Sequence, residues 1–269
     1  MLKNLSAFQI RRLFLIGTSL AFVAGLVNSV AFLAFGTYVS HISGHATRSA
    51  IELSELHPGV AGIFFMATLC FVLGASFTAV ILRGRFLTSF RANSMTPLII
   101  EAGLIAYVAF HMAIRPHKPG LYPEQAPFLL MSVSHAFYIF ILSFAMGMQN
   151  ALFRRSNGII IRTTHMTGIA TDMGISIGWL ISTSLIYVVD KLRFKKNESE
   201  KVFRENLQEK FSGKSLLLHL SLFMGFLSGV IAGTFGYLKP RFNVLFLAVF
   251  ILLFNAFNEY RTHHLNHQE

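Results

Sequence analysis

The sequence contains a single cysteine, Cys70, so the chain has no pair of thiols for an internal disulfide or a paired-thiol metal motif. Charged residues are also scarce, at 13% of the chain against about 25% in soluble globular domains. Hydrophobic residues make up 54% and gather in runs of about twenty, the length of helix that crosses the hydrocarbon of a bilayer. These features argue against a soluble enzyme and predict a bundle of membrane helices.

Acidic residues are few, at 12 against 23 Lys and Arg, which gives a formal net charge of +11. A basic chain can bind nucleic acid, but here the basic residues stand in short segments between apolar runs. That placement is typical of the loops that orient a membrane protein. We therefore expect membrane lipid as a partner and no nucleic acid.

Six apolar segments are predicted to span the membrane: 13–35, 59–82, 97–114, 128–153, 216–238 and 242–257. A seventh, 165–189, is long enough to cross, but its first half is rich in hydroxyl groups and glycine. If this segment enters and returns to the same side, most Lys and Arg fall on one side, including those of the polar linker 191–214. If it crosses fully, giving seven spans, that bias nearly vanishes. The positive-inside rule therefore favours six spans, a re-entrant 165–189, and cytoplasmic N- and C-termini.

An internal repeat is the most specific feature of the sequence. Ser-His-Ile-Ser-Gly-His-Ala-Thr at 40–47 matches Thr-His-Met-Thr-Gly-Ile-Ala-Thr at 164–171, and we call these the first and second motifs. Upstream of each motif a second pattern recurs with identical spacing: Leu20, Phe22, Gly25 and Asn28 correspond to Leu142, Phe144, Gly147 and Asn150. The matches predict two halves, 1–125 and 126–269, of three spans each. Because an odd repeat enters the membrane from opposite sides, we expect an inverted repeat with a pseudo-two-fold axis in the membrane plane.

The motifs place glycine and hydroxyl groups after a histidine, where lipid would require an unbroken apolar helix. Polar or irregular backbone persists at membrane depth only inside protein or beside a watery cavity. A helix that begins at each motif would point free N–H groups and its positive end at a polar or anionic solute. The predicted substrate-binding residues are Asn28, His41, Ser43, Gly44, Thr47, Asn150, Thr164, His165, Thr167, Gly168, Thr171 and Asp172.

Several of these residues have other interpretations. His41 and His165 could bind solute, relay protons or cap a turn, and the two asparagines could bond across helices. His41, His45 and Glu52 together suggest a metal site, but Ile169 replaces His45 in the repeat, so we expect no metal and no cofactor. Glu101 lies inside a predicted span, where a buried carboxyl group is what a proton-coupled carrier would need.

The chain resembles the YoaK-like family of bacterial inner-membrane proteins, which carry a domain of unknown function. The resemblance rests on Gly147, Met148, Gln149, Asn150, Ala151, Arg154, Arg155, Arg162, Thr163, Thr164, His165, Met166, Thr167, Gly168, Thr171 and Asp172, and on Phe22, Val23, Gly25, Ser40, His41, Ser43, Gly44 and Thr47 of the first half. It covers nearly the whole chain and implies about six spans in the bacterial inner membrane. It implies no substrate or reaction.

The sequence favours a small-solute transporter or permease whose polar site forms where the two motifs meet near the middle of the membrane. Two alternatives remain open. One is a membrane-embedded enzyme that uses His41 or His165 as acid or base. The other is a membrane scaffold or sensor that acts through the linker 191–214. The solute, the coupling ion and a possible homo-oligomer are not specified by the sequence.

Overall fold

The computed structural model describes six stretches of the chain: residues 6–83, 95–114, 133–155, 163–193, 213–239 and 241–265. Most of the predicted linker 191–214 lies outside these residues. Its predicted position on the cytoplasmic side therefore stays a prediction.

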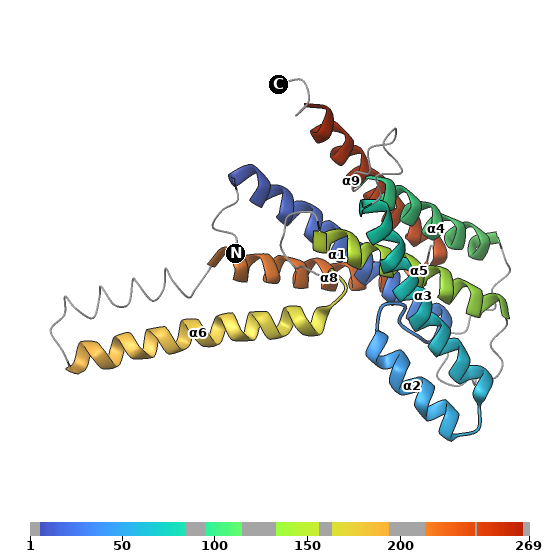
Figure 1. Ribbon diagram of the computed structural model, residues 1–269, viewed down its shortest axis with the longest axis horizontal. Coiled ribbons are helices and arrows are strands. Elements are labelled where there is room, and N and C mark those ends of the chain that lie inside the picture. Colours follow the sequence, from blue (N-terminus) through green and yellow to red (C-terminus); the bar gives the residue numbers. More distant parts are fainter. Residues whose placement is uncertain are drawn as a thin grey trace. The chain divides into compact units, whose positions relative to one another are not determined.

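Within the described residues the protein is helical, with no strand (Figure 1). The helices are α1 (Ala7–Phe35), α2 (Ile42–Ser54), α3 (Pro58–Arg83), α4 (Met95–Ile114), α5 (Val133–Arg155), α6 (Met166–Arg193), α8 (Gly213–Leu238), the short 3-10 helix η5 (Arg241–Val244) and α9 (Leu245–Leu265). The predicted all-α fold is confirmed, and each predicted span coincides closely with one of these helices.

Six of the described helices are long and apolar enough to cross a membrane, so the protein is a multi-pass membrane protein. The six candidates are Ala7–Phe35, Pro58–Leu82, Met95–Ile114, Met166–Val189, Gly213–Leu238 and Phe242–Arg261. This set contains α6, whereas the prediction counted α5 in its place. Moreover, α6 is one continuous helix of 28 residues. The described part of 165–189 therefore contains no break, and the predicted return of this segment to the same side of the membrane stays a prediction.

The chain divides into two compact units. One unit comprises Met1–Thr18 with His165–Met224, and the other comprises Ser19–Thr164 with Gly225–Glu269. The larger second unit contains the whole first motif and the first residue of the second motif. The remainder of the second motif lies in the first unit, together with the rest of α6.

Four Phe-x-x-Gly sequences build the centre of the larger unit, and they pack in two reciprocal pairs. A Cβ atom at Gly25 of α1 would overlap the carbonyl oxygen of Phe226 in α8, and one at Gly229 would overlap that of Phe22. The same exchange joins α3 to α5, where Gly74 lies against the Phe144 carbonyl and Gly147 against the Phe71 carbonyl. Only a residue without a side chain allows two helix backbones to approach this closely.

These crossings involve residues that correspond in the predicted repeat. Phe22 and Gly25 correspond to Phe144 and Gly147 in the predicted repeat, and each pair packs on a helix from the other half of the chain. The two partner helices also match, since α3 and α8 both have 26 residues. Each half therefore contributes one helix to each crossing.

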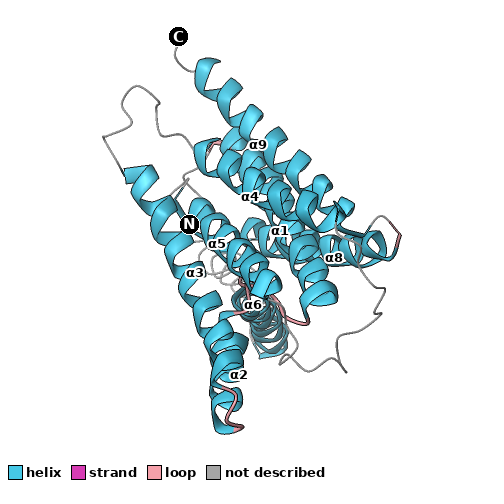
Figure 2. Ribbon diagram, turned by 90° about the vertical axis from the view of Figure 1, so that its right-hand side faces the viewer, coloured by secondary structure: helices cyan, strands magenta, loops and turns pink. Residues whose placement is uncertain are grey.

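The outer helices complete the larger unit. Helix α2 lies beside α3, and α4 lies beside α9 (Figure 2). Many apolar side chains of these helices are exposed, including Phe65 and Val80 of α3 and Phe250 and Phe254 of α9. Such an apolar exterior suits contact with lipid acyl chains.

Candidate functional site

The first motif begins with a turn that Asn28 holds in place. The Asn28 Oδ1 atom accepts hydrogen bonds from the backbone N–H groups of Val39 at 3.1 Å and Ser40 at 3.2 Å. Its Nδ2 atom donates to the Ser40 hydroxyl at 2.6 Å. Because α1 continues to Phe35, these bonds fold the chain back alongside α1 before α2 starts. Asn28 thus positions the motif, and all of these bonds stay within the first half.

The first turn of α2 gives the motif its local geometry. His41 is the N-cap residue, but its side chain makes no capping hydrogen bond, so the predicted capping alternative does not describe it. The imidazole instead lies directly over Gly44, where a Cβ atom would overlap the ring. The His41 carbonyl accepts the His45 N–H at 3.0 Å, and the Thr47 hydroxyl donates to the Ser43 carbonyl at 3.0 Å.

The second motif repeats this geometry residue by residue. Helix α6 begins immediately after His165, and the His165 imidazole lies over Gly168 in the same way. The His165 carbonyl accepts the Ile169 N–H at 3.1 Å, and the Thr171 hydroxyl donates to the Thr167 carbonyl at 2.9 Å. The prediction that a helix begins at each motif is confirmed. The two helices differ in length, since α2 has 13 residues and α6 has 28.

The two motifs begin at different levels of the same antiparallel helix pair. Phe35, at the end of α1, stacks with Tyr138 near the start of α5, at 6.3 Å between ring centroids. Gln149, near the end of α5, donates both to the Leu20 carbonyl at 2.8 Å and to the Thr163 hydroxyl at 3.0 Å. Helices α1 and α5 are therefore antiparallel, and residue 163 lies beside the middle of α1.

The positions of Asn28 and Leu20 measure the separation of the motif starts along α1. Ser40 is bonded to Asn28, whereas Thr163 lies at the level of Leu20. Eight residues (28 − 20) correspond to about 12 Å of helix. Each motif thus starts from a chain that has turned back into the bundle, one from each end.

The buried face of α2 contains His45, which is 2% exposed. Its Nε2 atom is hydrogen-bonded to the Tyr38 carbonyl and lies 3.4 Å from the Thr37 hydroxyl. Burial lowers the pKa of His45 below its ordinary value of 6.5, and the nearby His41 acts in the same direction, while the bond to Tyr38 opposes them. His45 is therefore a neutral core residue, with Nε2 carrying the proton that the carbonyl accepts.

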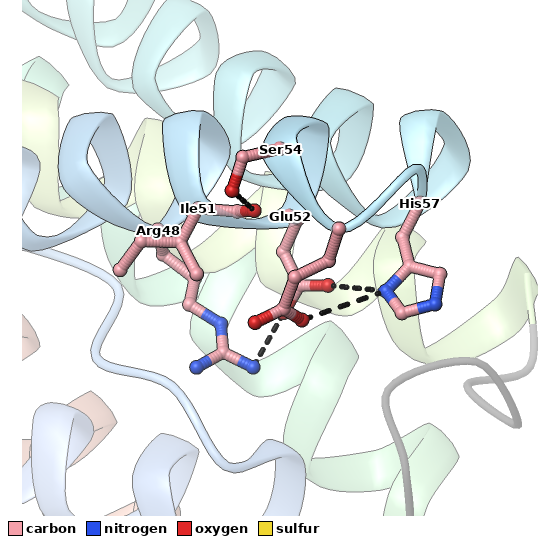
Figure 3. A network of polar contacts seen from close by, with 6 residues as sticks. Arg48, Ile51, Glu52, Ser54 and His57 are labelled. Carbon is pink, nitrogen blue, oxygen red and sulfur yellow. Dashed lines mark hydrogen bonds and ion pairs between the residues drawn. The ribbon is translucent and has the colours of Figure 1, made fainter.

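An ion-pair network closes the end of α2 (Figure 3). The Glu52 carboxylate, 3% exposed, pairs with Arg48 one turn earlier and with the Nδ1 atom of His57 at 3.2 Å. Glu55 lies 3.7 Å from the same nitrogen. Glu52, Glu55 and His57 could together offer three ligand atoms to a metal ion. Because Arg48 already contributes a positive charge to Glu52, the geometry fits a network that fixes the turn before α3 better than a cation site.

A shallow depression of about 320 Å³ opens on the exposed face of α2. It is lined by His41, Ser43, Gly44, Thr47, Arg48 and Ile51. Four of these six are predicted site residues, so the structure brings the first motif together on one surface. Arg48 was not predicted as a site residue, although its position corresponds to Asp172, which was.

The second motif differs from the first in its charge. Asp172 is exposed and its Oδ2 atom lies 3.7 Å from the Nε2 atom of His219 in α8. Asn150, which corresponds to Asn28, has an Oδ1 atom with no hydrogen-bond partner among the described residues. The neighbouring Gln149 makes the bond to Thr163 instead. The prediction missed Gln149 as a positioning residue, although it precedes Asn150 directly.

Glu101 of α4 is completely buried. Neither of its carboxyl oxygens has a hydrogen-bond partner in the described part of the chain. An unpaired carboxylate is costly at such a position, so the neutral acid is the form that this environment accepts. Glu101 belongs to α4 and is separate in sequence from both motifs.

Together, these features define a multi-pass helical membrane protein with two equivalent polar motifs, each at the start of a helix. A family model described as Protein of unknown function (DUF1275) matches residues 16–257. The chain belongs to this family, which is consistent with the resemblance seen in the sequence. No curated protein and no solved structure matches the chain.

Proposed function

We propose that the protein is a permease for a small polar or anionic solute. The observation that supports this function best is the paired geometry of the motifs: each begins a helix after the chain has turned back into the bundle from opposite ends of α1. Secondary transporters with inverted repeats use such helix starts, because their free N–H groups bind solute at membrane depth.

The two motifs would form two parts of one solute path. Each offers three N–H groups without a partner in its own helix, a histidine ring, and hydroxyl-bearing residues. Arg48 adds a positive charge at the first motif, and Asp172 adds a negative charge at the second. The path would thus bind an anionic group more strongly at the first motif than at the second. The solute would leave the path at the second motif. The inverted relation of the halves 1–125 and 126–269 is part of this proposal.

Transport into proteoliposomes tests the function. We expect purified protein to accelerate uptake of at least one of four labelled probes, namely phosphate, acetate, glycine and glucose, over protein-free liposomes. His41→Ala and His165→Ala should both reduce that uptake, because both ends of the path are needed. Leu53→Ala is the matched control, since Leu53 is an exposed residue of α2 outside the motif.

Two results would contradict the permease. One is that none of the four probes enters faster than into empty liposomes and none raises the unfolding temperature. The other is that only one histidine matters, which would favour the alternative of an enzyme with a single catalytic imidazole.

A further inference from the structure

Glu101 is a buried acid that packing alone does not explain. Its side chain is completely buried in α4, and neither carboxyl oxygen has a hydrogen-bond partner among the described residues. The other buried residues of α4 are all apolar, namely Pro97, Leu98, Ala102, Ile105, Val108, Ala109 and Met112. A carboxyl group without a partner adds no stability to such a face, because burial removes its bonds to water and returns none.

The length of α4 places Glu101 inside the hydrocarbon of the membrane. The 20 residues of this helix extend about 30 Å, which is the thickness of the hydrocarbon core. Glu101 stands six residues (101 − 95) after Met95, or about 9 Å along the helix axis. An ionisable residue at that depth marks a functional site by default, and with no bonded cation the group that neutralises it is a proton.

Other titratable groups near Glu101 can come from α4 itself and from the elements that pack on it, which are α9, α5, η5 and α3. Their described titratable side chains are Cys70, Tyr107, His111, His135, Tyr138, Glu259, Tyr260 and Arg261. Only Tyr138 and Glu259 of this set are buried, and neither is bonded to Glu101. Glu259 is therefore the natural comparison for Glu101, since it is a buried acid of the neighbouring helix.

From this burial we propose that Glu101 is a proton-binding site through which solute movement is coupled to a proton gradient. The inference rests on the proposed permease. The carboxyl group releases its proton when water reaches α4 and binds one again before the bundle closes. The closed, dry bundle retains the neutral acid, because it offers the carboxylate no partner.

Helix α5 provides a route from Glu101 to the second motif. It packs on α4, and its Gln149 donates to the hydroxyl of Thr163, which directly precedes the motif. The Ser143 hydroxyl of the same helix is also completely buried and has no partner in the described part of the chain. A movement of α5 at the second motif therefore changes the packing around α4 as well.

Infrared spectroscopy of the reconstituted protein tests the proton site without any solute. The neutral Glu101 carboxyl group should give a C=O band at neutral pH that is missing from Glu101→Gln and retained in the control Glu259→Gln. In D2O this band should shift, because a site that releases protons exchanges with water. Absence of the band would show an ionised group, and a band that does not shift would show a sealed structural acid. Either result would overturn the inference.

Gradient-driven uptake into proteoliposomes tests the coupling. A difference of two pH units across the membrane should change the accumulation of phosphate, glycine or glucose by up to about 100-fold for one proton per solute. Glu101→Gln has the shape of the neutral acid and should equilibrate the same solute without responding to the gradient. Glu101→Asp keeps a carboxyl group and should retain part of the response, and Glu259→Gln should retain all of it.

The outcomes separate this inference from the proposed function. Accumulation by Glu101→Gln that follows the gradient as in the native protein would overturn the coupling and leave the permease intact. Loss of the response in Glu259→Gln alone would assign the proton to Glu259 and also overturn the inference. Absence of any uptake by the native protein would remove the permease and the coupling with it, whereas the infrared bands would still decide whether Glu101 binds an exchangeable proton.

Discussion

At the scale of single residues, the two motifs share one arrangement: an imidazole that lies over a glycine in the first turn of a helix. The identical pattern of His, Gly and Thr predicted that both motifs begin helices, and this is confirmed at Ile42 and Met166. The contact between the ring and the glycine could not be predicted, because it depends on the rotamer of the histidine. The pattern alone also allowed a capping role that His41 does not have.

This contact makes a prediction for the pair His41 and Gly44. In the native chain, Gly44→Ala introduces a Cβ atom into the imidazole, which must move away. In a His41→Ala background the same change meets no ring and should stabilise the protein by up to about 1 kcal/mol, because Ala favours a helix over Gly. A double-mutant cycle of unfolding in detergent measures the coupling, expected at about 1 kcal/mol.

The second motif provides the matched cycle. His165→Ala with Gly168→Ala should show coupling of the same sign, since the ring and glycine have the same relation there. Additive effects in both cycles would show that the two imidazoles do not rest on their glycines.

His45 makes a prediction about pH. Because its pKa is lowered in the folded protein, the unfolded chain binds the proton more readily. Stability is therefore fully present above the ordinary pKa of 6.5 and is lost as pH falls below it, with a slope of at most about 1.4 kcal/mol per pH unit. Unfolding temperatures measured between neutral and mildly acidic pH should show this loss.

His45→Gln is the control for this loss. Glutamine can donate a hydrogen bond to the Tyr38 carbonyl but does not titrate, so the variant should be less sensitive to acid than the native protein. Equal sensitivity of the two proteins would assign the acid effect to other groups.

At the scale of helices, the reciprocal Phe-x-x-Gly crossings explain why α1, α3, α5 and α8 form the centre of the larger unit. The repeat predicted the equivalence of Phe22 and Gly25 with Phe144 and Gly147. It could not predict which helices they contact, because pairing depends on the fold and not on local spacing. A four-residue glycine spacing does not by itself produce a helix contact, because a Cβ atom at Gly174 or Gly178 meets nothing within 4 Å in the described residues.

Gly147 and Gly174 therefore make a contrasting pair of predictions. Gly147→Ala places a Cβ atom against the Phe71 carbonyl and should force α3 and α5 apart, at a cost of about 1–3 kcal/mol. Gly174→Ala adds the same atom in open space and should stabilise α6 by up to about 1 kcal/mol. The free energy of unfolding in detergent is measured for both variants. Equal changes in the two variants would contradict the close crossing of α3 and α5.

At the scale of the whole molecule, the membrane class and the all-α fold could be predicted, since they depend on composition and on apolar runs along the chain, whereas the inverted repeat stays a prediction. The continuous α6 was not predicted, because hydroxyl-rich and glycine-rich segments suit both a break and an exposed helix. The directions of α1 and α5 come from contacts between residues far apart in sequence, such as Gln149 with Leu20. Because α1 and α5 are antiparallel, the chain reaches the two motif starts from opposite ends of the bundle.

Thiol labelling from each side of the membrane tests this central claim most directly. Ser43→Cys and Thr167→Cys, both at exposed positions, are each made in a Cys70→Ser background. An impermeant maleimide is then applied to right-side-out and inside-out vesicles. Two motifs that enter from opposite ends should be labelled in opposite vesicle types. Preferential labelling of both cysteines in the same vesicle type would contradict the account.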